Sequence, residues 1–199
     1  MLAITWLLLA FMVGALPFSV WLGKLAVGQD IRQYGDHNPG ATNTLRAAGW
    51  RWGGLALLLD ISKGVIPVGL ALHWLSIEGW LLALIALAPV LGHAYSPFLQ
   101  FRGGKAIAAT GGVWIGLTSG EALLYLMPLF IIWYVLIADD GWTVVLTMTS
   151  FLGCLLFFGP LGVIVFVWLG TMLILTWKHR RELTTLPQFR SWIKNAWQL

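Results

Sequence analysis

Seven long apolar segments occupy most of this sequence and set what the chain can fold into. They run over residues 2–23, 53–75, 80–96, 106–118, 122–138, 142–158 and 161–177. Most have about the 17–25 residues that a helix needs to cross a bilayer, and the short fourth segment would fit where the bilayer is locally thin. Charged residues make up only 10% of the chain, which argues against a soluble domain. We therefore predict an all-α integral membrane protein in which residues 1–199 form one domain of seven transmembrane helices.

The positions of the 12 Lys and Arg residues predict the orientation of this bundle. The junctions after the second, fourth and sixth segments carry no Lys or Arg: residues 76–79, 119–121 and 159–160. The cations lie at the alternate junctions or in the tail, apart from Lys63 within the second segment. Because cytoplasmic loops are enriched in cations, we predict that the N-terminus lies outside and the C-terminus in the cytoplasm. No basic residue precedes the first segment, so we expect a retained helix rather than a signal peptide.

The tail, residues 178–199, mixes aromatic and basic side chains in the stretch LPQFRSWIKNAW. This mixture is typical of a segment that lies at the membrane–water interface on anionic lipids. We therefore predict a cytoplasmic interfacial tail. The outer junctions offer few polar groups that a ligand would need, so we expect any chemistry to face the cytoplasm.

The first cytoplasmic loop contains the stretch GDHNPGATNTLRAAGW, which combines small polar residues with a single cation, Arg46. Its glycines permit tight turns, and Thr42 or Asn43 is placed to cap a short helix that begins near Thr44. The free N–H groups of such a helix start, beside Arg46, suit an anion. The alternative is a structural turn whose arginine reaches the lipid headgroups.

The second polar group interrupts an apolar segment, in LLLDISKG. Asp60 and Lys63 are three residues apart and therefore share one face of a helix. They lie roughly 14–18 Å along that helix from Arg51, at 1.5 Å per residue. Ionisable groups at this depth are costly and normally face the bundle interior. We predict either a structural ion pair that joins helices or the wall of a polar cavity open to the cytoplasm.

The third group lies in LGHAYSPFLQFRGGKAIAATGG. Pro97 is expected to end the third helix, Gly103 and Gly104 to form a flexible turn, and Lys105 to begin the next helix. An ammonium beside the amides of a helix start suits phosphate. His93 lies one turn before the end of the third helix, where it either packs or reaches the same space.

Two further signals lie near the C-terminal end of the sequence. Thr143, Thr147 and Ser150 share one helical stripe, although such hydroxyls commonly bond to their own backbone carbonyls. His179 follows the last apolar segment and is either solvated or close to a ligand. Phosphate recognition is the chemistry that these signals share, whereas no Ser-His-Asp, HExxH or Cys/His metal pattern is present.

Four stretches and a histidine after the last helix resemble, in their order, the bacterial membrane-integral glycerol-3-phosphate acyltransferase family. The stretches are GALPFSVWLGKL, NPGATNTLR, LLLDISKG and LGHAYSPFLQFRGGKAIAATGG, between about Gly14 and Gly112. The resemblance implies a multi-pass enzyme of the bacterial plasma (inner) membrane that acts in phospholipid synthesis. It implies transfer of a fatty acyl group from acyl-phosphate to the 1-position of glycerol 3-phosphate, which gives lysophosphatidic acid. It implies no coenzyme A, acyl carrier protein, metal or other cofactor, and no nucleic acid.

The resemblance also assigns roles to the residues above. Lys105 and His179 are the predicted catalytic residues and, with Arg46, would hold glycerol 3-phosphate. The other predicted substrate contacts share a place on the cytoplasmic side: Asn38, Gly40, Thr42, Asn43, Asp60, Lys63, His93, Gly103, Gly104, Thr147 and Ser150. Catalysis would consist of positioning the substrates and stabilising the carbonyl oxyanion and the leaving phosphate.

Three positions depart from the family pattern. Asp36 stands where the family usually has Ser, Val144 where it has Arg, and Glu182 where it has Asn. An ionised Asp36 repels phosphate unless a cation such as Arg32, Arg46 or protonated His37 neutralises it. These departures leave a second hypothesis, a non-catalytic membrane subunit that binds or assembles with a protein partner. The lack of internal repeats argues against a transporter.

Overall fold

The computed structural model describes residues 1–158 and 162–196, and the regular structure of this part is helical, without a β-strand. The chain divides into two compact units, Met1–Gly120 and Glu121–Leu199. The helices of the first unit are α1 Leu2–Ala15, α2 Phe18–Val27, α3 Ala41–Ala48, α4 Trp50–His73, α5 Gly79–Ala94 and α6 Ile107–Leu117. Its 3-10 turns are η1 Ile31–Gln33 and η2 Pro97–Leu99. The second unit contains α7 Leu123–Leu136, α8 Asp140–Phe158, α9 Val163–His179, η3 Glu182–Thr184 and α10 Ser191–Ala196.

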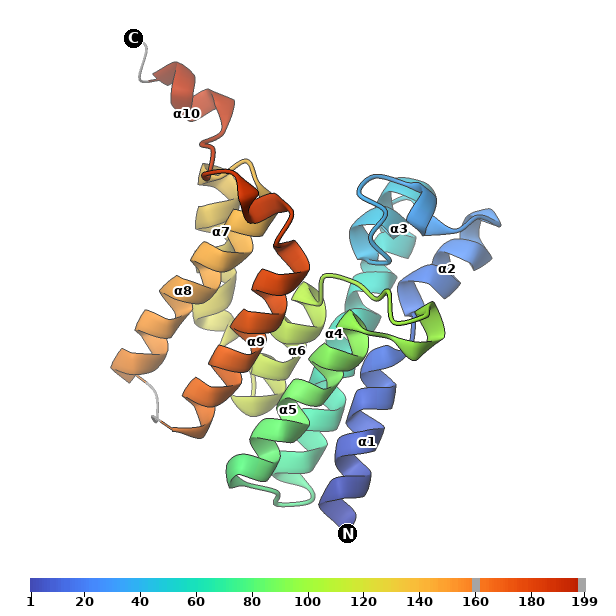
Figure 1. Cartoon of the computed structure of the whole chain (residues 1–199), viewed down its shortest axis with the longest axis vertical. Helices are drawn as coiled ribbons and strands as arrows, with labels where there is room; N and C mark the ends of the chain where they lie inside the picture. Colours follow the sequence, from blue (N-terminus) through green and yellow to red (C-terminus); the bar gives the residue numbers. More distant parts are fainter. Residues whose placement is uncertain (159–161, 197–199) are drawn as a thin grey trace. The chain divides into compact units, whose positions relative to one another are not determined.

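In the first unit, α1, α4, α5 and α6 lie side by side, and α2 and α3 lie together at one end of them (Figure 1). The backbones of α4 and α6 approach each other closely. A Cβ on Gly64 would meet backbone atoms of Ala109 and Val113, and a Cβ on Gly112 would meet the carbonyl oxygen of Ile61. Small residues at such contacts let helix backbones pack closely in membrane proteins. This contact holds α4, which carries Asp60 and Lys63, against α6, which follows Lys105.

The first apolar segment forms two helices rather than the single one predicted. α1 ends at Ala15 and α2 begins at Phe18, because Pro17 has no N–H to donate and keeps Leu16 out of the helical conformation. The hydroxyl of Ser96 donates to the carbonyl oxygen of Ala15 at 2.5 Å and so satisfies one of the groups that the break exposes. The break places Phe18 and Ser19 at the start of α2.

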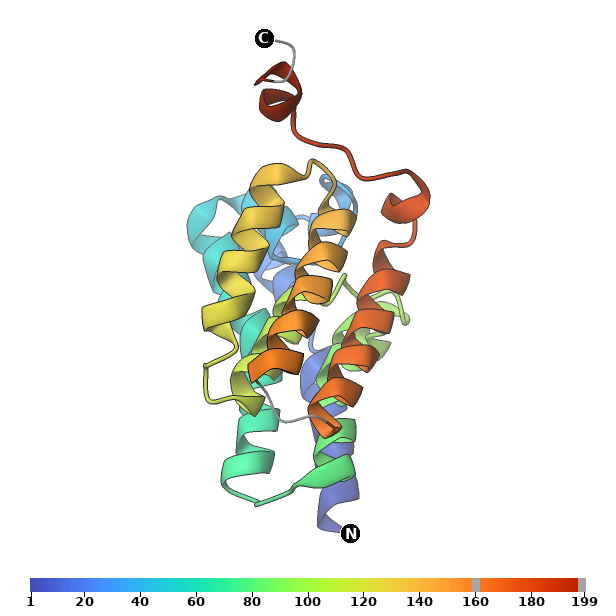
Figure 2. The ribbon, with the colours of Figure 1, turned by 90° about the vertical axis from the view of Figure 1, so that its left-hand side faces the viewer.

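In the second unit, α7, α8 and α9 lie side by side (Figure 2). The residues after α9 pair with the connection between α7 and α8: Ile137 and Phe189 form an isolated β-bridge, and the side chain of Asp139 accepts a hydrogen bond from the N–H of Gln188 at 3.0 Å. α7 has no buried residue. A helix that is apolar on every side and exposed is typical of a lipid-facing position.

The predicted apolar segments match the helices to within a few residues. Four helical stretches are long and apolar enough to cross a membrane, namely Leu2–Val27, Trp50–His73, Gly79–Leu99 and Asp140–Phe157, and three shorter apolar helices are Ile107–Leu117, Leu123–Leu136 and Val163–His179. The prediction of an all-α fold with apolar helices is confirmed for the described residues. The count of seven crossings and the orientation of the termini stay predictions, and the predicted outer junction 159–160 lies outside the described residues.

Candidate functional site

The loop before α3 and the first turn of α3 are joined by the side chain of Asn43. Asn43 is buried and donates to the carbonyl oxygen of Asn38 and to Asp36 Oδ1, both at 2.9 Å. Its own side-chain oxygen accepts from Arg46 Nη1 at 3.0 Å. Arg46 is an exposed residue. Its guanidinium lies against the loop, because a Cβ on Gly35 would meet it.

The start of α3 differs from the prediction. The helix begins at Ala41 with Gly40 as its N-cap, and no side chain caps it, so neither Thr42 nor Asn43 has that role. Thr42 is exposed, whereas the hydroxyl of Thr44 is buried between the carbonyl oxygens of Ser19 and Gly40, at 3.2 and 3.3 Å. The N–H groups of Asn43 and Thr44 donate to the carbonyl oxygen of Gly40, both at 3.1 Å, so the amides of Ala41 and Thr42 are the ones that a helix start leaves for a ligand.

Gly103 and Gly104 form a fixed turn rather than the predicted flexible one. The N–H of Gly104 donates to the carbonyl oxygen of His93 at 3.0 Å. A Cβ on Gly104 would meet the His93 ring, and a Cβ on Gly103 would meet the backbone of His93 and Ala94. The two glycines are therefore required by the close approach to α5. Lys105 precedes α6 instead of beginning it, because Ala106 is the N-cap and the helix begins at Ile107.

The turn and the loop meet in an ion pair between Lys105 and Asp36. Lys105 Nζ lies 2.7 Å from Asp36 Oδ2, and the side chains are 17% and 41% exposed. The cation that neutralises Asp36 is thus Lys105. The sequence suggested Arg32, Arg46 or His37 for this role. In the structure Arg32 pairs with Asp30 at 2.6 Å, Arg46 bonds to Asn43, and His37 Nδ1 lies 2.8 Å from the carbonyl oxygen of Arg32.

The protonation of Asp36 follows from these contacts. Partial burial raises the pKa of Asp36, but the hydrogen bond and the positive charge of Lys105 outweigh burial and hold the pKa below its ordinary value of 3.8. Since the pKa is lower in the folded protein, the pair contributes stability above the ordinary pKa. That contribution is lost as the pH falls through the lowered value. Asp36 is therefore ionised near neutral pH, and the site contains a fixed negative charge.

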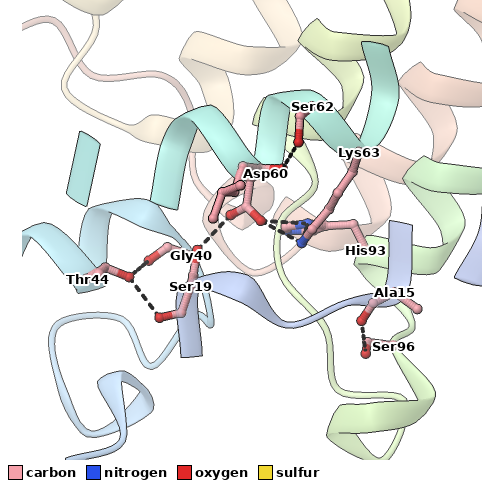
Figure 3. Close-up of polar contacts among 10 residues, drawn as sticks. Ala15, Ser19, Gly40, Thr44, Asp60, Ser62, Lys63, His93 and Ser96 are labelled. Atoms are coloured by element: carbon pink, nitrogen blue, oxygen red, sulfur yellow. Dashed lines mark hydrogen bonds and ion pairs between the residues drawn. The ribbon is translucent and has the colours of Figure 1, made fainter. Parts of the chain in front are cut away.

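A buried charge network of Asp60, Lys63 and His93 is shown in Figure 3. It adjoins the glycine turn, because a Cβ on Gly104 would meet the His93 ring. Lys63 Nζ is 2.6 Å from Asp60 Oδ1, and both side chains are 2% exposed. The hydroxyl of Ser19 donates to Asp60 Oδ2 at 2.7 Å, and Lys63 Nζ is 3.5 Å from His93 Nδ1. The network joins α2, α4 and α5, as expected of the predicted structural ion pair. Ser19 was not predicted as a polar partner, although it belongs to the stretch GALPFSVWLGKL.

Lys63 and His93 also line a small pocket. The pocket has a free volume of about 10 Å³, and Pro17, Pro39 and Gly104 complete its wall. This volume holds about one water molecule. Lys63 and His93 thus form part of a pocket wall, as the second of the two sequence alternatives expected. Asp60, Lys63 and His93 lie where they support the turn before Lys105, and direct contact between them and a substrate stays a prediction.

The remaining predicted residues belong to the second unit. The hydroxyl of Thr147 donates to the carbonyl oxygen of Thr143 at 2.7 Å, and Ser150 accepts from the indole N–H of Trp133 at 3.0 Å. His179 is the last residue of α9 rather than the residue after it, and it is buried. Its Nδ1 lies 2.8 Å from the carbonyl oxygen of Leu175. The roles of these three side chains as substrate contacts stay predictions.

Two of the departures from the family pattern, Val144 and Glu182, lie in this unit, one in the apolar core and the other beside His179. Val144 is buried in an apolar cluster with Met148 and Leu175, so the valine is part of the core. Glu182 and His179 both pack against Gly141, where a Cβ would lie 2.9 Å from Glu182 Cβ and 3.3 Å from His179 Cβ. Glu182 is therefore a neighbour of the predicted catalytic histidine.

Comparison with known proteins places this arrangement in a family. The model of the family described as glycerol-3-phosphate acyltransferase matches residues 4–188. The chain belongs to this family. The family predicted from the four sequence stretches is thereby confirmed, and the match extends well beyond them on both sides.

Relatives with the family's name align over nearly the whole chain. The glycerol-3-phosphate acyltransferase of Maridesulfovibrio salexigens is 35% identical over 203 residues, which cover 100% of this chain and 98% of that protein. Glycerol-3-phosphate acyltransferase 1 of Thermotoga maritima is 35% identical, over 87% of this chain and 92% of that protein. Similarity at this level favours an enzyme of the family over the non-catalytic subunit.

The fold matches solved structures of the family. The crystal structure of PlsY (YgiH), an integral membrane glycerol 3-phosphate acyltransferase, in its glycerol 3-phosphate form superposes with a TM-score of 0.83. It is 28% identical and covers 100% of both chains. The lysophosphatidic acid form of PlsY has a TM-score of 0.81 and covers 92% of this chain and 90% of that one. This protein is therefore a multi-pass membrane acyltransferase.

Proposed function

We propose that the protein transfers a fatty acyl group from acyl-phosphate to the 1-hydroxyl of glycerol 3-phosphate. The hydroxyl oxygen attacks the acyl carbonyl carbon, the bond from that carbon to the phosphate oxygen breaks, and the released phosphate carries away the hydroxyl proton. The products are lysophosphatidic acid and phosphate. Family membership supports the acceptor, since PlsY is known in a glycerol 3-phosphate form and a lysophosphatidic acid form.

One observation supports the site: Lys105 and Arg46 are brought to a single loop. Asp36 holds Lys105 at 2.7 Å, and Asn43 links Asp36 to Arg46 through bonds of 2.9 and 3.0 Å. Two cations beside the start of α3, where Ala41 and Thr42 are the first two helical residues, are suited to a phosphate group. We assign the phosphate of glycerol 3-phosphate to Lys105 and Arg46.

In the first unit, the donor is assigned to the backbone amides of residues 38–43 that have no acceptor within the 35–43 loop, those of Ala41 and Thr42 at the start of α3. In the second unit, Thr147 and Ser150 stay predicted donor ligands, and His179 stays a predicted catalytic residue. Catalysis then rests on holding the hydroxyl and the acyl carbon close together and on donors directed at the oxyanion and the leaving phosphate. Acyl-phosphate already carries a good leaving group, so this proposal needs no cofactor. Membrane lipids surround the acyl chain.

A reconstitution assay tests this reaction. Purified protein in lipid vesicles is given acyl-phosphate and glycerol 3-phosphate, and phosphate release and lysophosphatidic acid are both measured. We expect the two products in equal amounts and only when both substrates are present. Phosphate release that does not depend on glycerol 3-phosphate, or transfer that requires acyl-CoA, would contradict the assigned reaction.

We propose seven membrane crossings, with the N-terminus outside, the C-terminus in the cytoplasm and the active site facing the cytoplasm at the bacterial plasma membrane. The charge asymmetry of the junctions supports this orientation. Residues 178–199 would then lie at the cytoplasmic interface. The exposed Leu186, Phe189 and Trp192 support contact of this tail with lipid.

The orientation predicts which positions a membrane-impermeant thiol reagent reaches in intact cells. In a Cys154→Ser background, cysteines at the exposed residues Glu78 and Glu121 should react, and those at Gln33 and Arg102 should react only after the cells are opened. Gln33 and Arg102 are chosen in place of the nearby glycines Gly35 and Gly103. A cysteine side chain at either glycine would collide with neighbouring atoms. Reaction of Gln33→Cys in intact cells would overturn the proposed orientation.

A further inference from the structure

The carboxylate of Asp36 is fixed in place by the loop that carries it. Asp36 Oδ1 accepts from the side chain of Asn43 at 2.9 Å and from the N–H of Asn38 at 3.3 Å. Asp36 Oδ2 forms an ion pair with Lys105 Nζ at 2.7 Å. An ionised carboxylate offers about four acceptor positions, so three bonds leave about one. Asp36 is therefore a rigid acceptor, and the long side chain of Lys105 reaches toward it.

A phosphate that binds Lys105 must lie close to this carboxylate. A phosphate oxygen that accepts a hydrogen bond from Lys105 Nζ lies at most about 5.5 Å from Asp36 Oδ2, which is the span of two consecutive hydrogen bonds. At that separation the carboxylate repels a doubly charged phosphate about twice as strongly as a singly charged one. A singly protonated phosphate also has a P–OH group, which is able to donate to the remaining acceptor position.

We propose that Asp36 makes the site of this enzyme select the singly protonated form of the phosphate ester over the doubly charged form. The inference rests on the proposed function, because it takes the phosphate of glycerol 3-phosphate to bind at Lys105. Phosphate monoesters lose their second proton near pH 6. Asp36 therefore favours binding on the acid side of neutrality, and it is a specificity-determining residue of this site.

The other charged groups around Asp36 in the first unit have partners of their own. Lys105 is paired with Asp36 itself, and Arg46 bonds to Asn43. Arg32 is held by Asp30 at 2.6 Å, and Asp60, Lys63 and His93 form their own network beside Gly104. Asp36 stays ionised between pH 5 and 8.5, since its pKa is lowered.

His37 adjoins Asp36 and is the exposed histidine of this loop, with Nδ1 2.8 Å from the carbonyl oxygen of Arg32. Histidine changes charge within the same pH range, so its contribution needs a separate variant. His37→Asn removes the imidazole. Asparagine tolerates the positive φ of 61° that this position has.

The experiment is a calorimetric titration of the full-length protein in detergent with glycerol 3-phosphate alone, between pH 5 and 8.5. The variants are Asp36→Asn, which keeps the shape of the side chain, and Asp36→Ser. The matched controls are Asp30→Asn, which removes a carboxylate of the same loop that is bound to Arg32, and His37→Asn. Since no acyl donor is added, the result does not depend on turnover.

We expect the wild-type Kd, divided by the Kd of Asp36→Asn, to be within a few-fold of one at pH 5 and to rise to about tenfold at pH 8. That rise is the scale of one extra unit charge at a partly exposed site. Asp36→Ser should show the same rise, and Asp30→Asn should show a ratio that does not change with pH. The rise should persist when both compared proteins also carry His37→Asn. Effects of groups common to both proteins cancel in the ratio.

If glycerol 3-phosphate binds but the ratio of the wild-type Kd to the Asp36→Asn Kd does not change with pH, the inference is overturned and the proposed function stands. Weaker binding by both Asp36 variants than by the wild type at pH 8 has the same meaning. A rise that is lost when both compared proteins also carry His37→Asn overturns the inference too, because the rise would then require the histidine. Absence of glycerol 3-phosphate binding in every protein contradicts the proposed function as well. If a thermal transition shows that one Asp36 variant is unfolded, the other decides.

Discussion

Replacing Lys105 by alanine is expected to abolish glycerol 3-phosphate binding and acyl transfer while both units stay folded. The substitution removes a charge-assisted hydrogen bond, typically worth about 1.5–3 kcal/mol. It also leaves Asp36 without Lys105, so that an ionised carboxylate faces the phosphate. Because Asp36 is 41% exposed, solvent screening reduces that repulsion to about 1–2 kcal/mol. Together the two effects weaken binding by roughly two to four orders of magnitude.

Calorimetry with glycerol 3-phosphate and the kcat/KM of acyl transfer measure this effect. Lys24→Ala is the matched control, because Lys24 is an exposed lysine at the end of α2. The double variant Lys105→Ala with Asp36→Asn should recover part of the lost affinity, since the repelling charge is gone as well. Unchanged affinity in Lys105→Ala with an intact thermal transition would remove Lys105 from the phosphate site.

Replacing Lys63 by methionine is expected to cause the largest loss of stability. Lys63 and Asp60 are each 2% exposed and 2.6 Å apart, and removal of one partner leaves a buried charge uncompensated. Such changes cost about 3–5 kcal/mol. The network also contacts His93, whose carbonyl oxygen holds Gly104. We therefore expect a lower unfolding temperature in detergent and, in the folded fraction, weaker phosphate binding.

The double variant Asp60→Asn with Lys63→Met tests the cause of this loss. It removes both charges, so stability should recover in part. Ser62→Ala is the control on the same helix, because its hydroxyl bonds only to the carbonyl oxygen of Leu59, at 2.8 Å. A loss of stability in the double variant as large as in Lys63→Met would show that packing, rather than the unpaired Asp60, is responsible.

The helices were predictable because the bilayer imposes one strong requirement, a continuous apolar run. The segment 142–158 became α8 at Asp140–Phe158, and the segment 80–96 became α5 at Gly79–Ala94. The break at Pro17 was not predicted, since both sides of it are equally apolar and hydropathy does not register a missing N–H. The fold was therefore predictable at the level of spans and not at the level of breaks within them.

The candidate site was predictable in its residue types and less so in its pairings. The sequence predicted that a cation near Asp36 in the chain, such as Arg32, would neutralise it. Arg32 instead binds Asp30, at 2.6 Å. Lys105 comes from a distant part of the chain and is brought to Asp36 only by the packing of the turn on His93. The glycines of that turn suggested flexibility, whereas the structure needs them for close approach to α5. A single sequence contains no signal for such contacts.

The position of bound glycerol 3-phosphate tests the central claim most directly. A structure of the protein solved with this ligand should show the phosphate within hydrogen-bond distance of Lys105 Nζ and of the Arg46 guanidinium, beside the loop of residues 35–43. A phosphate bound elsewhere, with Lys105 still paired with Asp36 and Arg46 still bonded to Asn43, would contradict the assigned site.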